Sequence, residues 1–207
     1  NVVVERLWVQ TWLTSDVRQE RAVFQIRSPE ESIRIRLPKG VPQARVQVAV
    51  DGVEAAKSIR DPGQIVLSLP PGTRNRSCVL ELFYALDPPP QRLGLATARL
   101  QPAQIDGASP PRRSYWELAL PTGQHLLTLP REMTAEMDWD AGRWLMSRRP
   151  ALDEQQLQRW IGPSRQEPLP RSANFYLFGG LGQPPALDIV SAQRRLIVAA
   201  PSGAILQ

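Results

Sequence analysis

His125 and Cys78 are the only histidine and the only cysteine in the 207 residues. A Ser-His-Asp arrangement would therefore need His125 as its general base. The sequence contains no Gly-x-Ser-x-Gly turn, and His125 lies in a predicted hairpin among leucines. Nothing in the sequence supports pairing Cys78 with His125, and alternation with Leu80 and Leu82 indicates a buried, inert thiol. We therefore predict no catalytic residue and a protein that is not an enzyme.

Metal and phosphate sites have equally little support. One cysteine and one histidine exclude the usual zinc ligand sets. The richest acidic stretch, residues 132–142, resembles part of a calcium loop, but Trp139 interrupts incomplete spacing, which favours a solvated hairpin edge. The glycine-rich residues 179–182 precede two prolines rather than a helix, so they lack the geometry of a phosphate-binding turn. We predict no metal and no cofactor.

The aromatic residues support one binding hypothesis. Trp8 and Trp12 share one face of the first predicted strand and alternate with Arg6 and Gln10. Flat rings beside hydrogen-bonding side chains are what a sugar-stacking or peptide-binding platform requires. Together with Trp116, these residues are the candidate ligand-binding residues, with carbohydrate as the candidate ligand. The favoured alternative is structural: arginine stacks on the rings, or the first strand buries both of its faces.

Charge argues against nucleic acid as a partner. The chain carries 25 Lys plus Arg against 20 Asp plus Glu, for a net charge of +5. The basic residues do not cluster; the only tight pairs of arginines lie at 112–113, 148–149 and 194–195. This spacing is typical of a solvated, arginine-biased surface rather than of a phosphate-binding stripe.

Alternation of apolar and polar residues dominates residues 1–90. Residues 22–27, 33–37 and 46–50 each alternate with period two, which is typical of strands with one buried face. Asp51 and Gly52 separate two such runs and predict a type I′ hairpin. About seven short strands with turn residues between them predict a β-sandwich, and the prolines at 88–90 predict its boundary. Residues 101–113, which are also rich in Pro, Gly and Ser, are a second candidate for the boundary.

Residues 91–207 predict a second β-rich module with one short helix near 153–161. Asp153 and Gln156 have the spacing of a capping box, and Gly162 followed by Pro163 ends the helix. Residues 115–120 and 125–129 predict a hairpin, and 174–178, 186–190 and 195–199 predict closing strands. The fold class expected is thus mainly β, with two sandwich-like modules, and the first strand is open to pairing with the second module.

Residues 5–14 and the Leu-Pro pairs that end several strands resemble extracytoplasmic β-modules of large uncharacterised bacterial envelope proteins. The resemblance implies β-sandwich modules and a membrane-tethered parent, and it assigns no activity. The apolar residues 196–207 fit either a final strand with a short tail or a chain trimmed before a membrane anchor. We predict a non-catalytic structural or protein-interaction module of an envelope protein, whose partners are other domains of its parent chain or other envelope proteins. The alternative is a carbohydrate-binding module.

Overall fold

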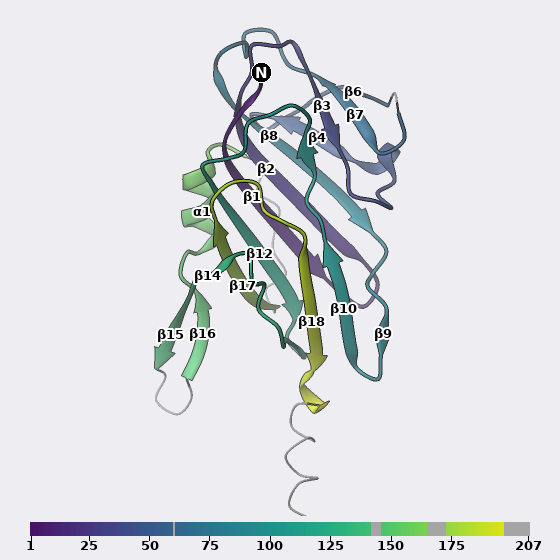
Figure 1. The fold of residues 1–207 in the computed structure, drawn as a ribbon, viewed down its shortest axis with the longest axis vertical. Coiled ribbons are helices and arrows are strands. Elements are labelled where there is room, and N and C mark those ends of the chain that lie inside the picture. Colours follow the sequence, from purple (N-terminus) through teal and green to yellow (C-terminus); the bar gives the residue numbers. More distant parts are fainter. Residues whose placement is uncertain (60, 142–145, 165–172, 197–207) are drawn as a thin grey trace, which may run out of the picture.

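The computed structural model describes residues 1–59, 61–141, 146–164 and 173–196 (Figure 1). These residues are mainly β, as the alternation predicted, and α1 (Glu154–Ile161) is the one α-helix named among them. Asp153 caps α1 as expected: its side chain accepts a hydrogen bond from the Gln156 backbone, and the Gln156 side chain accepts one from the Asp153 backbone. A short 3-10 helix, η1, covers Gln43–Arg45.

An eight-stranded central sheet organises the molecule, with the order β14-β17-β12-β1-β2-β8-β4-β5. The pairing of β1 with β12 is parallel, and the other pairings in this sheet are antiparallel. Its strands are β1 (Val3–Leu13), β2 (Arg18–Arg27), β4 (Gln47–Val50), β5 (Val53–Glu54), β8 (Ser77–Leu86), β12 (Arg113–Pro121), β14 (Thr134–Ala135) and β17 (Ala173–Gly180).

Two four-stranded sheets and a hairpin complete the strands. One sheet has the order β13-β18-β10-β9, with β13 (Gln124–Leu126), β18 (Leu187–Gln193), β10 (Leu95–Leu100) and β9 (Gln91–Arg92). The other has the order β11-β3-β7-β6, with β11 (Gln104–Ile105), β3 (Ser32–Arg36), β7 (Gln64–Ser68) and β6 (Lys57–Ile59). The hairpin joins β15 (Met137–Ala141) to β16 (Met146–Pro150).

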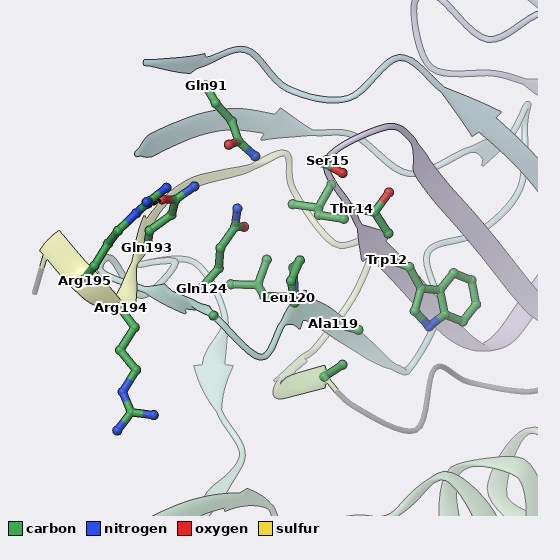
Figure 2. A pocket seen from close by; sticks show the side chains of 14 residues that line it. Trp12, Thr14, Ser15, Gln91, Ala119, Leu120, Gln124, Gln193, Arg194 and Arg195 are labelled. Carbon is green, nitrogen blue, oxygen red and sulfur yellow. Dashed lines mark hydrogen bonds between the residues drawn. The ribbon is translucent and has the colours of Figure 1, made fainter. Parts of the chain in front are cut away.

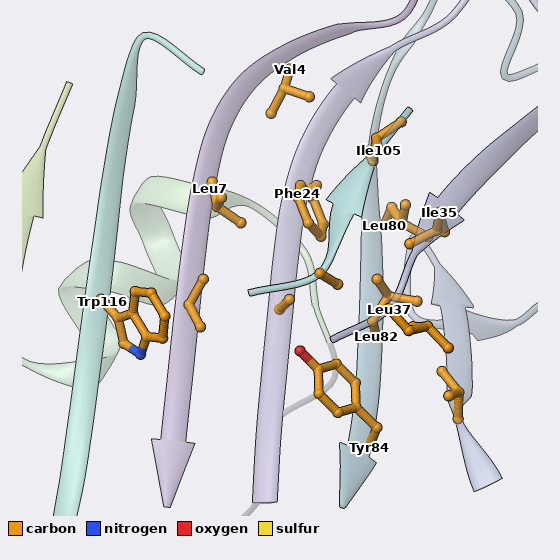
Figure 3. Packing of buried hydrophobic residues seen from close by; sticks show 14 of the residues in the cluster. Val4, Leu7, Phe24, Ile35, Leu37, Leu80, Leu82, Tyr84, Ile105 and Trp116 are labelled. Atoms are coloured by element: carbon orange, nitrogen blue, oxygen red, sulfur yellow. The ribbon is translucent and has the colours of Figure 1, made fainter. Parts of the chain in front are cut away.

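The main hydrophobic core lies between the central sheet and the two smaller sheets (Figure 3). Leu7 of β1, Phe24 of β2 and Leu82 of β8 line one side of it, while Ile35 of β3 and Ile189 of β18 lie on the other. All five are at most 2% exposed. Burial of this many branched and aromatic side chains supplies the main driving force for the fold.

The opposite face of the central sheet is covered as well. Leu157 and Ile161 of α1 pack on Trp8, Val23 and their neighbours in a second, smaller apolar cluster. Strand β1 is therefore buried on both faces, which is the structural alternative that the sequence favoured for its tryptophans.

The sheets are not divided at the expected boundary between residues 90 and 91. Strand β1 pairs with β12 along seven residues, from Arg6 opposite Arg113 to Trp12 opposite Ala119. The expected pairing of the first strand with the second half of the chain is thus confirmed, and both halves contribute to one sheet. A parallel pairing needs a long crossover, and alternation along either strand does not reveal it.

One turn predicted from the sequence is confirmed by the structure, and another is wrong. Asp51 and Gly52 have φ values of 49° and 80°, as the predicted type I′ turn between β4 and β5 requires. The hairpin predicted around residues 121–123 is wrong, because β12 and β13 belong to different sheets. The chain there leaves the central sheet, and that departure forms part of the site described next.

Candidate functional site

A pocket of about 640 Å³ lies at one end of the central sheet, where several strands end (Figure 2). Such a volume is typical of ligand sites in proteins, which run from roughly 300 to 1,000 Å³. The chain contributes the end of β1 with the following turn, the end of β12, residues of β9 and β13, the start of β17 and the end of β18 with residues 194–195.

The apolar part of the pocket comes from β1 and β12. Trp12 and Ala119 are cross-strand partners, while Leu13 and Leu120 project from the other face of the same strands. The pocket therefore wraps around the strand ends. These four residues are at most 6% exposed, so the apolar wall is held by the core of the molecule rather than by a loop.

The turn after β1 is fixed by its own hydrogen bonds. The Thr14 hydroxyl accepts from the backbone of Val17 at 3.1 Å, and the Thr14 backbone donates to the Val17 carbonyl at 3.0 Å. The Thr14 hydroxyl is thus committed to the turn, a usual role of threonine there. Ser15, at the tip, is exposed at the rim of the pocket.

Asn174 holds the segment between β12 and β13 against β17. Its amide nitrogen donates to the backbone carbonyl of Gln124 at 2.6 Å and to that of Thr122 at 3.2 Å. Because these bonds fix the backbone of Gln124, its half-buried side chain stands at a defined place in the pocket wall.

The end of β18 brings Gln193 and Arg195 to the pocket. The backbone of Gln193 donates to the Gly94 carbonyl at 2.9 Å, and the backbone of Arg194 donates to the Gly123 carbonyl at 2.7 Å. Gly94 has a φ of 78°, a conformation that L side chains rarely adopt. The predicted closing strand at 195–199 is wrong for residues 195–196, which form a helical turn, and 197–199 lie outside the described residues.

The two arginines of the pocket differ in direction. The Arg195 Nε donates to the Gln193 side-chain oxygen at 2.7 Å, and the two side chains run together (Figure 2). Arg194 extends away from the other labelled side chains. Arg195 is therefore the cation that faces the pocket.

The pocket has a one-sided charge. No aspartate or glutamate is among its lining residues, whereas both arginines are exposed. A second pocket of about 550 Å³ is different, because Arg99 and Arg131 share it with Glu132 and Asp188. There Arg99 and Asp188 form an ion pair at 3.4 Å. Only the first of these two pockets presents unbalanced positive charge.

A chain of buried polar side chains crosses the α1-covered face of the central sheet. Gln10 donates to the Glu117 carboxylate at 2.7 Å and accepts from Arg21 at 2.6 Å. Arg21 also pairs with Glu81 and donates to the Ser164 hydroxyl at 2.8 Å. Burial raises the pKa of Glu117 to about 7, opposed by the hydrogen bond from Gln10 and reinforced by the nearby charge of Glu154.

A second buried carboxylate, Glu20, lies on the core side of the same sheet. Arg18 donates to Glu20 at 2.7 Å, and the Tyr84 hydroxyl donates to it at 2.7 Å. Burial raises the pKa of Glu20, although both partners act in the opposite direction. Its donors come from β2 and β8, so this carboxylate ties the core strands together.

The structure does not bring the predicted tryptophans together as a surface platform. Trp8 and Trp116 are fully buried, and Trp12 is 6% exposed. The Arg21 guanidinium lies 5.2 Å from the centre of the Trp8 ring, and the Trp116 indole donates to the Thr11 hydroxyl at 2.9 Å. The hypothesis of a sugar-stacking face on Trp8 and Trp116 is therefore wrong, since neither ring has a face open to a ligand.

The other predicted residues have structural contacts of their own. Arg6 donates to the Trp160 carbonyl and stacks 5.4 Å from the centre of its ring, which ties β1 to α1. Gln10 belongs to the buried polar chain. Trp12 packs against Phe83 with ring centres 6.4 Å apart and also lines the pocket, although it is only 6% exposed. Trp12 is thus the one predicted site residue that lines the pocket.

His125 and the acidic stretch do not form a metal or catalytic cluster within the part of the chain that the structure describes. His125 is half-buried in β13, opposite Ala192. No group of three or more His, Cys, Asp or Glu could hold a metal ion among the described residues. The side chains of Trp139 and Asp140 and all of Trp144 lie outside the described part.

Sequence reasoning missed Gln91, Gln124 and Gln193 as pocket residues. Each comes from a different strand, and glutamine alone carries no spacing signal. The one sequence signal is the arginine pair at 194–195, although the spacing of the basic residues predicts ordinary surface charge there.

The sequence matches no protein-family model and no curated protein. Solved structures do share the fold. Yeast LTA4 hydrolase is 12% identical, with a TM-score of 0.51 over 93% of this chain and 29% of its own. A mutant two-domain M1 zinc metallopeptidase bound to L-arginine is 11% identical, with a TM-score of 0.50 over 92% of this chain and 42% of its own. The chain thus spans less than half the length of either structure, and this likeness concerns the fold alone.

None of the helices in the described residues has both the length and the apolar character needed to cross a bilayer.

Proposed function

We propose that this chain is a non-catalytic interaction module of a larger protein, with the pocket at the strand ends as its binding surface. The extent of the structural likeness supports the proposal that this chain belongs to a larger protein. About nine-tenths of this chain corresponds to only 29% and 42% of two longer chains, so this fold occurs as one portion of larger proteins.

The residue inventory supports the non-catalytic part of the proposal. Zinc peptidase motifs on a helix use two histidines, and this sequence has one histidine and one cysteine in total. His125 in β13 has no carboxylate or hydroxyl partner among the contacts described. A parent with zinc-peptidase activity would have to carry its two-histidine motif outside this chain.

The size of the native protein tests whether this chain belongs to a larger one. An antibody raised against the 207 residues should detect, in the source cells, a band well above 23.2 kDa. The sequence-based expectation of a membrane-tethered envelope parent is part of the proposal, and the same blot on cytosolic and membrane fractions tests it. A native band at 23.2 kDa with no larger form would overturn the parent-chain proposal.

An activity assay tests the proposal that the chain is not catalytic. The purified chain, incubated with Zn²⁺ and a panel of aminoacyl p-nitroanilides, should give no turnover above buffer. Hydrolysis that a chelator abolishes and that copurifies with the folded chain would contradict the non-catalytic role.

A further inference from the structure

The pocket presents hydrogen-bond donors on its cationic side. The Gln193 oxygen accepts from the Arg195 Nε, so the Gln193 Nε2 is left as a donor beside the rest of the guanidinium. A guanidinium carries five N–H groups, and only one of them is used in this contact. Arg195 forms no ion pair with the described residues.

A carboxylate is the ligand group that fits this arrangement. The planar fork of arginine matches a carboxylate, and charge-assisted hydrogen bonds are about twice as strong as neutral ones. Because the lining contains no aspartate or glutamate, an incoming carboxylate meets no like charge. Since Arg194 extends away, a single guanidinium faces the pocket, which suits one carboxylate better than the multiple charges of a phosphate group.

The remaining lining suits a polypeptide. The side chains of Gln91, Gln124 and Gln193 point toward the same space from three strands (Figure 2). Each amide both donates and accepts, as a peptide group does. Pro121 and Ala173, which are half-buried, line the same pocket and offer apolar surface to a ligand.

We propose that this pocket binds an extended acidic segment of a partner polypeptide, with an aspartate or glutamate side chain on Arg195 and a neighbouring apolar side chain against Pro121 and Ala173. The inference rests on the proposed interaction role and names the chemistry of its partner. The size and activity tests above do not depend on it.

Calorimetric titration with short peptides tests the proposal. The probe is acetylated and amidated Ala-Leu-Asp-Leu-Ala, compared with the same peptide carrying asparagine or lysine in place of aspartate. The aspartate peptide should bind saturably, and the asparagine peptide should bind at least about tenfold more weakly. Arg195→Gln should weaken the aspartate peptide by a similar factor and leave the asparagine peptide unchanged. The control Arg131→Gln, in the second pocket, should leave both affinities unchanged.

Several results of the peptide titrations would overturn the proposal. Equal binding of the aspartate and asparagine peptides, or no saturable binding of either, would overturn the proposal. An asparagine peptide with a free C-terminus that binds as tightly as the amidated aspartate peptide would overturn it in favour of terminal-carboxylate capture. Arg195 is exposed, so the variant should fold, and a circular dichroism spectrum identical to that of the parent chain confirms this. If peptide binding fails while the native protein is larger than 23.2 kDa, only this inference falls and the module proposal stands.

Discussion

The Gln10 amide donates a hydrogen bond of 2.7 Å to the Glu117 carboxylate and so joins β1 to β12. The same amide accepts from Arg21 at 2.6 Å, which fixes its orientation. These residues are at most 5% exposed. Buried polar groups that satisfy one another specify one arrangement of strands, because any register shift would leave a charge without its partner.

The first prediction concerns Glu117 and pH. Burial raises the pKa of its carboxyl from the ordinary 4.5 to about 7 in the folded protein. A raised carboxyl pKa means that folding favours the protonated form. The stabilisation that the protonated Glu117 carboxyl gives to the fold is therefore fully present below about pH 4.5 and is lost as the pH rises through 7. Glu117→Gln keeps a neutral acceptor for Gln10, so it should be more stable than the parent chain at pH 8 by up to about 3 kcal/mol and nearly equal at pH 5.

Urea unfolding at both pH values measures this difference. Glu54→Gln, on the exposed strand β5, is the matched control and should change stability little at either pH. A stability gain for Glu117→Gln that is the same at pH 5 and pH 8 would contradict the assignment of the raised pKa.

Arg21 gives the second prediction. It pairs with Glu81 and donates to Gln10 and Ser164, with only 1% of its surface exposed. Arg21→Met retains the apolar stem but removes the cation that pairs with the buried Glu81, and removing one member of such a pair costs about 3–5 kcal/mol. The control Arg34→Met lies on exposed β3 surface and should cost less than about 0.5 kcal/mol. Chemical denaturation of both variants at pH 7 measures the two losses. An Arg21→Met variant as stable as the control would contradict the stabilising role of Arg21.

The sequence predicted which residues form strands better than it predicted which strands pair with one another. Alternation in residues 33–37 correctly placed Ile33 and Ile35 toward the core, because a buried face imposes a period of two. It also predicted a capped helix after Asp153, since capping is local. The same alternation could not distinguish Gln10 facing water from Gln10 facing Glu117, because both give a polar residue at the same parity. The pocket was beyond reach for a related reason: Gln91, Gln124 and Gln193 meet only through sheet pairings between distant segments.

Cys78 carries the third prediction. The thiol is buried, and burial, followed by the charge of Asp51, raises its pKa to about 11. A thiolate is the reactive form, so the native protein should not react with a disulfide reagent at pH 8, and the denatured chain should release one equivalent. The reaction followed in increasing urea should coincide with the loss of tryptophan burial. Rapid modification without denaturant would show that β8 opens locally or that the thiol is exposed.

The fourth prediction isolates one hydrogen bond in the core. The Trp116 indole donates to the Thr11 hydroxyl at 2.9 Å, and both side chains are fully buried. Thr11→Val preserves the shape but leaves the indole N–H without an acceptor, which should destabilise the chain by about 1–3 kcal/mol. Thr11→Ser keeps the hydroxyl and loses only a methyl group, at a cost of roughly 1 kcal/mol. Thr97→Val, on the exposed face of β10, should be within about 0.5 kcal/mol of the parent chain. Urea unfolding followed by tryptophan fluorescence ranks the three variants. If Thr11→Ser proves as destabilising as Thr11→Val, packing around Thr11 rather than its bond to Trp116 holds β1 and β12 together at this point.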